Sequence, residues 1–488
     1  MTGLLVAPAV LVVLVPFAAA ATLGVLPGMR LAAWVNLAAS GLVFLLACLL
    51  PFSLGAAGVL LRVDPLAATM AVLAAFIGFT AAWVSIGCIA AEQAAGRLDP
   101  PRVRLYHALF QTYLGAVLLA LLADNLGVMW VAIEAATVAA VLVVGLSRSH
   151  AAIEAAWKFF ILCGVGIALA LFGTILLTLA AGSVLGPGFA AMSWTGLARA
   201  APHLPGPLLN LAFVFVLFGY GTKAGLVPLH VWLPDSHAEG PTPFSAVLGA
   251  LAPIVALVAL LRLRAVLSAN VAAGGGAMAP GGALMALGLL SVLLGTISLW
   301  RRGDVKRFFA FSSIEQSGVI AFAFGLGGRM AVFAGLLQLI LHALAKAAVF
   351  QCVGRAAQLK GGQRFTDIGG LIAGHPALGW LLAGAIAAVA GLPPFGLFVS
   401  EFLILGEAVL RVPWLALLLG AGLILGALGL ILRLQSLCFG PPTKDCGPAP
   451  GGPALAAPAV HLVLVLLLGL ALPMALGGWL YGIAGTFR

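Results

Sequence analysis

The stretch LLNLAFVFVLFGYGTKAGLVPLHVWLP, residues 208–234, decides what kind of fold the chain adopts. Residues 208–227 are apolar enough to cross a hydrocarbon core of about 30 Å as one helix. They nevertheless contain Lys223, and they end in Gly225 and Pro228. Proline removes a backbone donor and clashes with the preceding helical turn. The stretch therefore predicts a membrane helix that breaks close to a buried cation, which is typical of transporters.

The composition of the whole chain agrees with a membrane protein. Its 488 residues are 63% hydrophobic and only 8% charged, whereas about a quarter of the residues of a soluble protein are charged. Apolar dominance and only 6 Cys exclude a disordered chain and a disulfide-stapled secreted domain. We predict an all-α polytopic membrane protein with about 14 transmembrane helices, at 4–25, 31–52, 66–90, 106–123, 126–147, 155–181, 208–227, 243–266, 280–300, 308–326, 330–353, 377–409, 413–436 and 458–481.

The distribution of the 24 Lys+Arg residues predicts the orientation. Loops after odd-numbered helices carry fourteen of them, the opposite loops carry seven, and three lysines lie within apolar runs. Because cytoplasmic loops are enriched in Lys and Arg, both termini are expected on the outer side of the cytoplasmic membrane.

Two of the predicted helices, the seventh and the twelfth, are broken at comparable places. The seventh breaks at Gly225 and Pro228, and the twelfth breaks in AGLPPFGLFVSEF (390–402) at Pro393 and Pro394. Such paired breaks indicate an internal repeat. Helices four to eight and nine to thirteen then form two five-helix repeats, and an odd number inverts the second copy. The expected organisation is 1–104 (three helices), 105–266 (first repeat), 267–436 (second repeat) and 437–488 (a loop and the last helix).

Ionisable residues inside the predicted helices are the candidate functional groups. They are Glu134, Lys158, Lys223, Glu315, His342, Lys346 and Glu401. Each costs about 2.5–3.5 kcal/mol at the centre of a membrane helix, so each needs a partner, water or a function. Burial shifts the proton affinity of Lys and of carboxylates toward neutrality, and His already titrates there. The set therefore favours proton transfer over bond-making chemistry.

Structural interpretations of the same residues stay open. Glu134 is compatible with a salt bridge that only holds the bundle together, and Lys158 with a side chain that snorkels to the interface. Glu315 is compatible with an interfacial ion pair to the basic residues before it. His342 and Lys346 share one helix face because they are four residues apart.

Other chemistries have little support in the sequence. The cysteines show no C-x-x-C spacing, so an iron–sulfur or zinc site is not expected. His230 and His237, with Asp235 and Glu239, resemble a metal cluster only superficially. No phosphate-binding glycine loop is evident. We expect no cofactor, no metal and no redox centre in this chain, and no binding to nucleic acid.

Four motifs in order carry a family resemblance: GYGTKAGLVPLHVWLPDSHAEGPTPFSAVLG (219–249), DVKRFFAFSSIEQSG (304–318), LHALAKAAVF (341–350) and AGLPPFGLFVSEF (390–402). They resemble the antiporter-like proton-translocating subunits of respiratory complex I, Mrp antiporters and membrane-bound hydrogenases. With residues 108–144 and EAAWKFFILCG (154–164), the chain is most similar to the F-type membrane subunit of hydrogenase-4 and formate hydrogenlyase complexes.

The resemblance implies roles for matching residues. Lys223 is implied as the central proton carrier of the first half-channel, with Glu134 tuning its proton affinity, and Lys158 as a further member of the path. His342 and Lys346 match a relay in helix eleven, and Glu401 matches the group from which protons leave. His230 and His237 match the uptake side, and Glu315 is either a relay or an interfacial pair.

Two departures from the family pattern stand out. Helix eight, LGALAPIVALVALLR (248–262), has no ionisable residue before Arg262, and Gln316 stands where relatives often carry His.

We therefore expect a subunit that moves protons outward while partner subunits, a membrane arm and a peripheral redox arm, transfer electrons. The alternatives are an Mrp-like Na⁺ or K⁺/H⁺ antiporter, a structural subunit with an inactive path, and the membrane half of an energy-coupled inorganic-carbon uptake complex.

Overall fold

A computed structural model describes residues 2–26, 28–55, 58, 60–300, 303–447 and 452–487. Within these ranges the chain is almost entirely helical and contains no β-strand. Arg301, Arg302 and Arg488, three of the basic residues used to predict orientation, lie outside the described residues. The all-α polytopic architecture expected from the sequence is confirmed.

The helices are α1 (Thr2–Val25), α2 (Met29–Ala47), α3 (Pro65–Ala94), α4 (Pro100–Leu122), α5 (Leu126–Val144), α6 (His150–Leu185), α7 (Trp194–Ala200), α8 (Gly206–Ala224), α9 (Trp232–Glu239), α10 (Thr242–Ala272), α11 (Gly281–Leu299), α12 (Val305–Leu326), α13 (Gly328–Lys360), α14 (Leu371–Gly374), α15 (Pro376–Val389), α16 (Gly396–Arg411), α17 (Pro413–Cys438), α18 (Gly452–Leu470) and α19 (Met474–Gly485).

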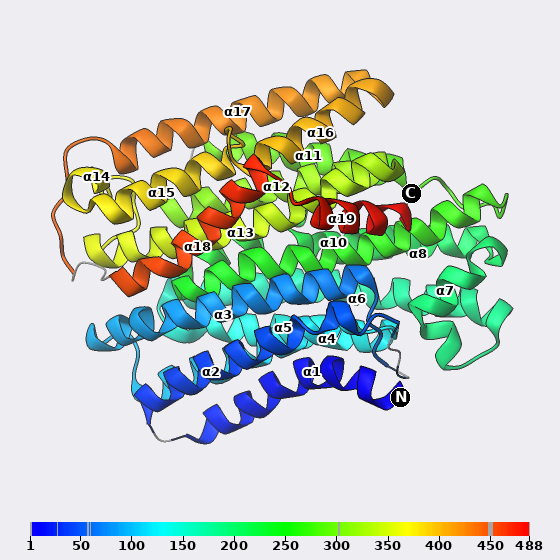
Figure 1. Ribbon diagram of the computed structural model, residues 1–488, viewed down its shortest axis with the longest axis horizontal. Helices are drawn as coiled ribbons and strands as arrows, with labels where there is room; N and C mark the ends of the chain where they lie inside the picture. The colour runs from blue at the N-terminus through cyan, green and yellow to red at the C-terminus, as the bar shows by residue number, and fades with distance from the viewer. Residues whose placement is uncertain are drawn as a thin grey trace.

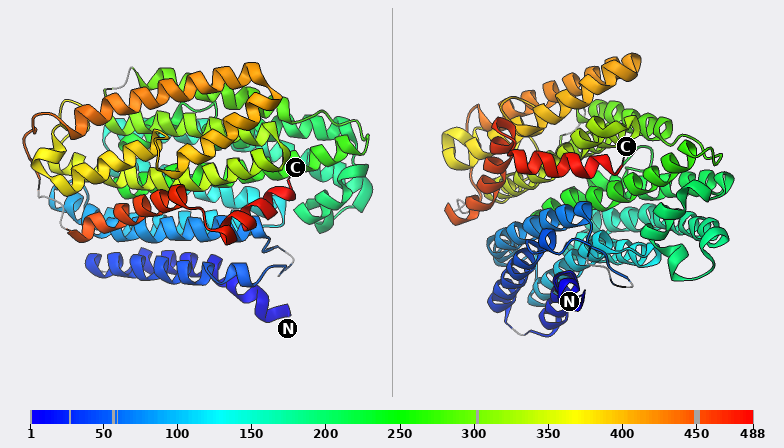
Figure 2. Two further views of the ribbon diagram at one scale, coloured as in Figure 1. Left: turned by 45° about the horizontal axis from the view of Figure 1, so that its top comes forward. Right: turned by 45° about the vertical axis from the view of Figure 1, so that its right-hand side comes forward.

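Most helices lie roughly side by side along the long axis of the molecule (Figures 1 and 2). The pair α1 and α2 forms one edge of the bundle, α16 and α17 form the opposite edge, and α10 and α13 run through the middle. The most apolar stretch of α13 is wholly buried, and that of α10 is 94% buried. The two ends of the described chain lie at the same end of the bundle (Figure 1).

Local sequence signals set several helix starts. A side-chain oxygen at the residue before the helix accepts a hydrogen bond from the backbone of the first turn, which satisfies an otherwise free N–H group. The capping residues of α3, α4, α5, α6 and α12 are Asp64, Asp99, Asn125, Ser149 and Asp304.

The count of about fourteen crossings stays a prediction. Among the described residues, twelve helices are long and apolar enough to cross a membrane, and α18 with α19 forms a further pair bent by 83°. The expected helix 377–409 is divided into α15 and α16, neither of which is long enough alone.

Both expected breaks exist. α8 stays helical through Lys223 and ends at Gly225, whose φ is 75°. The backbone around Lys223 is helical, and Gly219 serves packing: a Cβ there would lie 2.6 Å from the backbone nitrogen of Ala170. The second break separates α15 from α16 over residues 390–395. Val227–Pro228 and Pro393–Pro394 are cis peptide bonds.

Candidate proton-translocation sites

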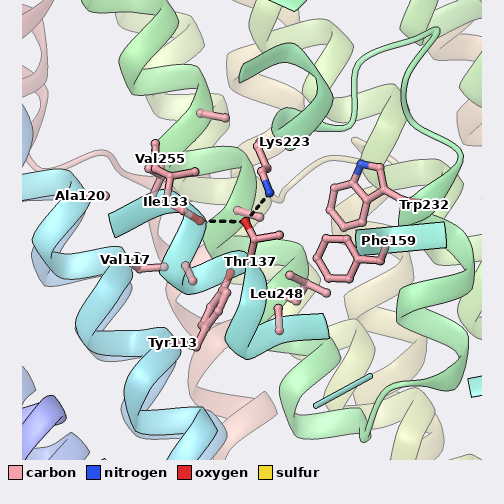
Figure 3. Close-up of a pocket in the computed structure, with 14 residues that line it drawn as sticks. Tyr113, Val117, Ala120, Ile133, Thr137, Phe159, Lys223, Trp232, Leu248 and Val255 are labelled. Atoms are coloured by element: carbon pink, nitrogen blue, oxygen red, sulfur yellow. Dashed lines mark hydrogen bonds between the residues drawn. The ribbon is translucent and has the colours of Figure 1, made fainter. Parts of the chain in front are cut away.

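The first candidate site surrounds Lys223 in the last turn of α8. Its ammonium group is buried and donates a hydrogen bond to the hydroxyl of Thr137 on α5 (Figure 3). The nitrogen also lies 6.0 Å from the centroid of the Phe159 ring of α6. A cavity of about 30 Å³ adjoins the lysine, which is room for about one water molecule. The lysine therefore has one side-chain acceptor and space for a bound water beside it.

The walls of this cavity are mostly apolar and come from six helices. Phe159 and Trp232 stack with ring centroids 4.4 Å apart, and the Trp232 indole donates to the Thr222 carbonyl at 2.9 Å. That contact ties α9 to the end of α8. The cavity is lined by Tyr113, Val117, Ala120, Ile133, Ala136, Thr137, Ala140, Phe159, Lys223, Trp232, Leu248, Ala252, Val255 and Ala256.

Glu134, the acid expected to partner Lys223, is near it but not in contact. Among the described residues no ion pair joins the two side chains, although each acts electrostatically on the other. One carboxylate oxygen of Glu134 is buried with no hydrogen-bond partner. The structural salt bridge that stayed open for Glu134 does not occur among the described residues. An acid that does not contact Lys223 can change the proton affinity of the lysine without holding it permanently charged.

The second candidate site is centred on Lys346 in α13. The Lys346 ammonium group is wholly buried and donates to the Phe309 carbonyl at 2.9 Å and to the Ser312 hydroxyl, both on α12. His342, one turn earlier on α13, is also wholly buried, and neither of its ring nitrogens has a hydrogen-bond partner. On this predicted shared face, the Lys346 side chain lies one helical turn from an imidazole whose two nitrogens have no hydrogen-bond partner.

Glu401 in α16 lies in a hydrogen-bonded cluster that joins three helices. Its carboxylate accepts from the Gln316 amide of α12 at 3.0 Å and from the Gln338 amide of α13 at 3.2 Å. Gln338 also donates to the Gln316 carbonyl oxygen and accepts from the Ser400 hydroxyl. A Cβ on Gly391 would lie 2.2 Å from the carboxylate, so the backbone of the helix break makes room for this acid.

Glu315 belongs to the interior and not to the interface. Its side chain is buried, one oxygen has no hydrogen-bond partner, and a Cβ on Gly426 of α17 would lie 2.1 Å from the other. The alternative of an interfacial ion pair is wrong, because Lys306 and Arg307 lie elsewhere and no ion pair involving Glu315 occurs among the described residues. Glu315 is thus a buried acid close enough to Lys346 to act on it electrostatically.

Lys158 lies in a surface cluster of charges. Its side chain is 44% exposed and pairs with Glu154 at 2.6 Å and with Asp235 at 3.2 Å. Asp235 and Glu239 in turn pair with Arg307 at 3.0 and 3.3 Å. This arrangement supports the interpretation of Lys158 as an interfacial side chain. Burial raises the pKa of Glu239, an effect that Arg307 and Lys306 oppose.

The two histidines of the uptake motif occupy different surroundings. His230 is half-buried beside Phe311, with ring centroids 6.3 Å apart. His237 is wholly buried and stacks on Phe350 of α13, with centroids 4.8 Å apart. They do not form a metal centre with Asp235 and Glu239: no group of three or more His, Cys, Asp or Glu residues in the described ranges is arranged to hold a metal ion.

The sequence did not identify Lys306 as a buried residue, because it falls in a predicted loop. It starts α12, is 5% exposed, and donates to the carbonyls of Ala238 and Gly240 at 3.3 and 3.2 Å. Lys306 also lines a polar cavity of about 750 Å³ together with Glu92, Glu239 and Gln358. Gln338 and Ser400 were missed as well. Gln338 lies four residues before His342, on the same helix face, and Ser400 directly precedes Glu401. Only these positions could have marked them.

A helical membrane bundle with buried lysines, buried acids and two interrupted helices defines the class of ion-translocating membrane proteins. Residues 123–427 match the family described as NADH:quinone oxidoreductase/Mrp antiporter, TM, and the chain belongs to that family.

The chain is 46% identical to the hydrogenase-4 component F homolog of Methylacidiphilum infernorum, over 96% of this chain and 97% of that protein. A chain of respiratory complex I from Thermus thermophilus superposes with a TM-score of 0.78 at 25% identity, covering 96% of this chain and 98% of that one. A chain of the Mrp complex from Dietzia sp. has the same fold, with a TM-score of 0.84 at 20% identity over 99% and 98% of the two chains.

Proposed function

We propose that this chain is the proton-translocating membrane subunit of a hydrogenase-4-like or NADH:quinone oxidoreductase-like complex. The family and the 46% identical hydrogenase-4 relative support a place in such a complex. Electron transfer takes place in partner subunits, in a peripheral arm, while this chain moves protons from the cytoplasm outward across the inner membrane. Both termini face the outer side.

The observation that carries the proposal is the pair of buried lysines with polar neighbours in each half of the bundle. Lys223 and Lys346 are wholly or almost wholly buried, and neither forms an ion pair among the described residues. A buried lysine without a counter-ion releases its proton easily, and each lysine donates to a hydroxyl that can pass a proton on. Lysines that only held the bundle together would be paired with acids.

The remaining predicted groups take roles consistent with their positions. Protons enter from the cytoplasmic cavity beside Lys306 and Glu239, where His230 and the cluster around Lys158 also lie at the uptake side. They leave at the outer side through Glu401, where α16 begins after its break. The two five-helix units, 105–266 and 267–436, each contribute one lysine to the path, in inverted orientation.

The test uses inverted membrane vesicles that contain the assembled complex and are energised by its own electron-transfer reaction. Lys223→Ala and Glu134→Ala should leave electron transfer measurable while lowering the number of protons moved per electron. Arg199→Ala is the matched control, since its side chain is exposed on α7 and does not line the Lys223 cavity; that variant should keep the wild-type ratio. An unchanged ratio in Lys223→Ala contradicts the proposal.

An Mrp-like antiporter is the second candidate, supported by the shared fold alone. Vesicles that contain only this chain would then show pH changes that depend on Na⁺ or K⁺. Our proposal predicts none.

A further inference from the structure

The helix between the two lysine sites, α10, has no ionisable side chain from Thr242 to Leu261. At Gly249 it has no side chain at all, and the ring of His237 fills that place. A Cβ on Gly249 would lie 3.0 Å from Cε1 and 3.3 Å from Nε2 of His237. An imidazole from α9 therefore occupies the position beside α10 where a side chain of α10 itself would project.

His237 is held there without any hydrogen bond to its ring. The side chain is wholly buried, and both ring nitrogens lack a hydrogen-bond partner. The ring is fixed by shape, since it stacks on Phe350 and lies against Gly249. Its backbone is fixed too, because the Ser245 hydroxyl of α10 donates to the His237 carbonyl at 3.0 Å. Buried polar atoms in native proteins are normally partnered, and an exception calls for a functional reason or a bound water.

The surroundings of His237 belong to both lysine sites. On one side, the cavity beside Lys223 is lined by Trp232 of α9 and by Leu248, the residue that precedes Gly249. On the other side, Phe350 lies one helical turn from Lys346 on α13. Lys346 is near enough to act on the imidazole electrostatically, as is Lys306 at the cytoplasmic cavity. The ring thus stands where α9, α10 and α13 meet, between the two halves.

We propose that His237 carries protons between the Lys223 site and the Lys346 site, in the place that Gly249 leaves open on α10. One ring nitrogen accepts a proton as the first site loses it, and the other nitrogen releases a proton toward Lys346. The ring is unchanged in charge after each transfer, and a ring rotation restores the starting arrangement before the next transfer. This inference rests on the proposed function, because it assigns a link within the same path.

The experiment moves the imidazole from one helix to the other. His237→Gln keeps a polar side chain of similar size that cannot be protonated. In the double variant His237→Ala with Gly249→His, the imidazole projects from α10 into the space that the native ring vacates. The double variant His237→Ala with Gly249→Leu is the matched control, since it fills that space without a titratable group. All are compared in vesicles for protons moved per electron, and native gels measure the amount of assembled complex.

We expect His237→Gln to lower the proton-to-electron ratio by about tenfold or more, because a positioned acid–base group contributes typically about 10²–10⁴-fold. The Gly249→His double variant should recover a large part of that ratio, and the Gly249→Leu variant should not. A wild-type ratio in His237→Gln overturns the inference, as does equal recovery with leucine or no recovery with histidine. If Lys223→Ala still lowers the ratio in those cases, the proposed function stands and only the link assigned to His237 fails.

Discussion

The two halves of the bundle hold their central lysines in different ways. Lys223 donates to the hydroxyl of Thr137 in a cavity with apolar walls, the Cys163 thiol also acts on it, and the nearby acid Glu134 does not touch it. Lys346 has two acceptors on α12 and lies close to a second buried acid, Glu315. The second half also contains the amide cluster around Glu401.

The difference indicates that a similar layout of helices supports two kinds of lysine environment. A lysine with few polar neighbours and no acid in contact loses most of its support when one group changes. A lysine in a polar network keeps part of its support, because the remaining partners still bind it. The first half should therefore be sensitive to single substitutions that the second half tolerates.

The largest expected effect comes from removing each lysine. Lys223→Met and Lys346→Met should each lower proton translocation about a hundredfold, because a positioned proton carrier contributes typically 10²–10⁴-fold. If the sites act in series, the double variant is no worse than either single variant. Proton uptake by vesicles, normalised to electron transfer, measures this. Independent losses that multiply would show two parallel paths.

The next largest difference is expected between Glu401 and Glu134, in how far the removal of each acid lowers the stability of the protein. Glu401→Leu leaves the Gln316 amide without its acceptor, which costs about 1–3 kcal/mol for an unsatisfied group, while the Gln338 amide keeps its bond to Gln316. Glu134→Leu removes no hydrogen bond, so it should change stability by less than about 1 kcal/mol. Thermal unfolding of the purified complex in detergent measures both. Equal destabilisation by the two variants would contradict the contrast between the halves.

Removing the hydroxyl that accepts from each lysine should have a smaller effect on proton translocation, and the effect should be larger at Thr137 than at Ser312. Thr137→Val removes the hydroxyl that accepts from Lys223, and a hydrogen bond to a charged group contributes about 1.5–3 kcal/mol. Proton translocation should fall about tenfold, which corresponds to about 1.4 kcal/mol. Ser312→Ala should have a lesser effect, since Lys346 keeps the Phe309 carbonyl. Thr137→Ser, which restores the hydroxyl, is the control and should be near wild type.

The smallest effect concerns a surface contact that belongs to the second half alone. Asp445, after α17, pairs with Lys360 at 2.6 Å and with His375 at 2.8 Å. Hydrogen bonds from these two side chains lower the pKa of Asp445. A lowered folded-state pKa stabilises the loop above the unfolded value of about 3.9 and loses that effect as pH falls below it. Hydrogen exchange in residues 440–447 should rise below about pH 4, whereas Asp445→Asn should show fast exchange already at pH 7.

Much of the fold could be predicted from the sequence, because membrane helices need long apolar runs. The two breaks, most of the spans and the burial of Lys223, His342 and Lys346 follow from hydropathy and from Gly or Pro positions, whereas Glu401 is half-buried. Gly225 ends the helix as predicted, whereas Gly219 serves close packing, which the sequence did not indicate. Periodicity in a single sequence does not separate these two uses of glycine.

The details of the sites could not be predicted, because they depend on contacts between distant helices. The Glu401 cluster joins residues 85 and 63 positions apart in the chain. The contact of His237 with Gly249 depends on how the short helix α9 turns back against α10. Lys306 looked like a loop residue, and only the packed structure shows that its side chain is buried.

The most direct measurement for the central claim is the proton-to-electron ratio of Lys223→Arg. Arginine keeps the positive charge but is not deprotonated in proteins, so the variant separates a structural cation from a proton carrier. If Lys223 releases and rebinds protons, the complex assembles and transfers electrons while the ratio drops as far as in Lys223→Met. A wild-type ratio in Lys223→Arg would contradict the account, because a permanent charge would then be sufficient at this position.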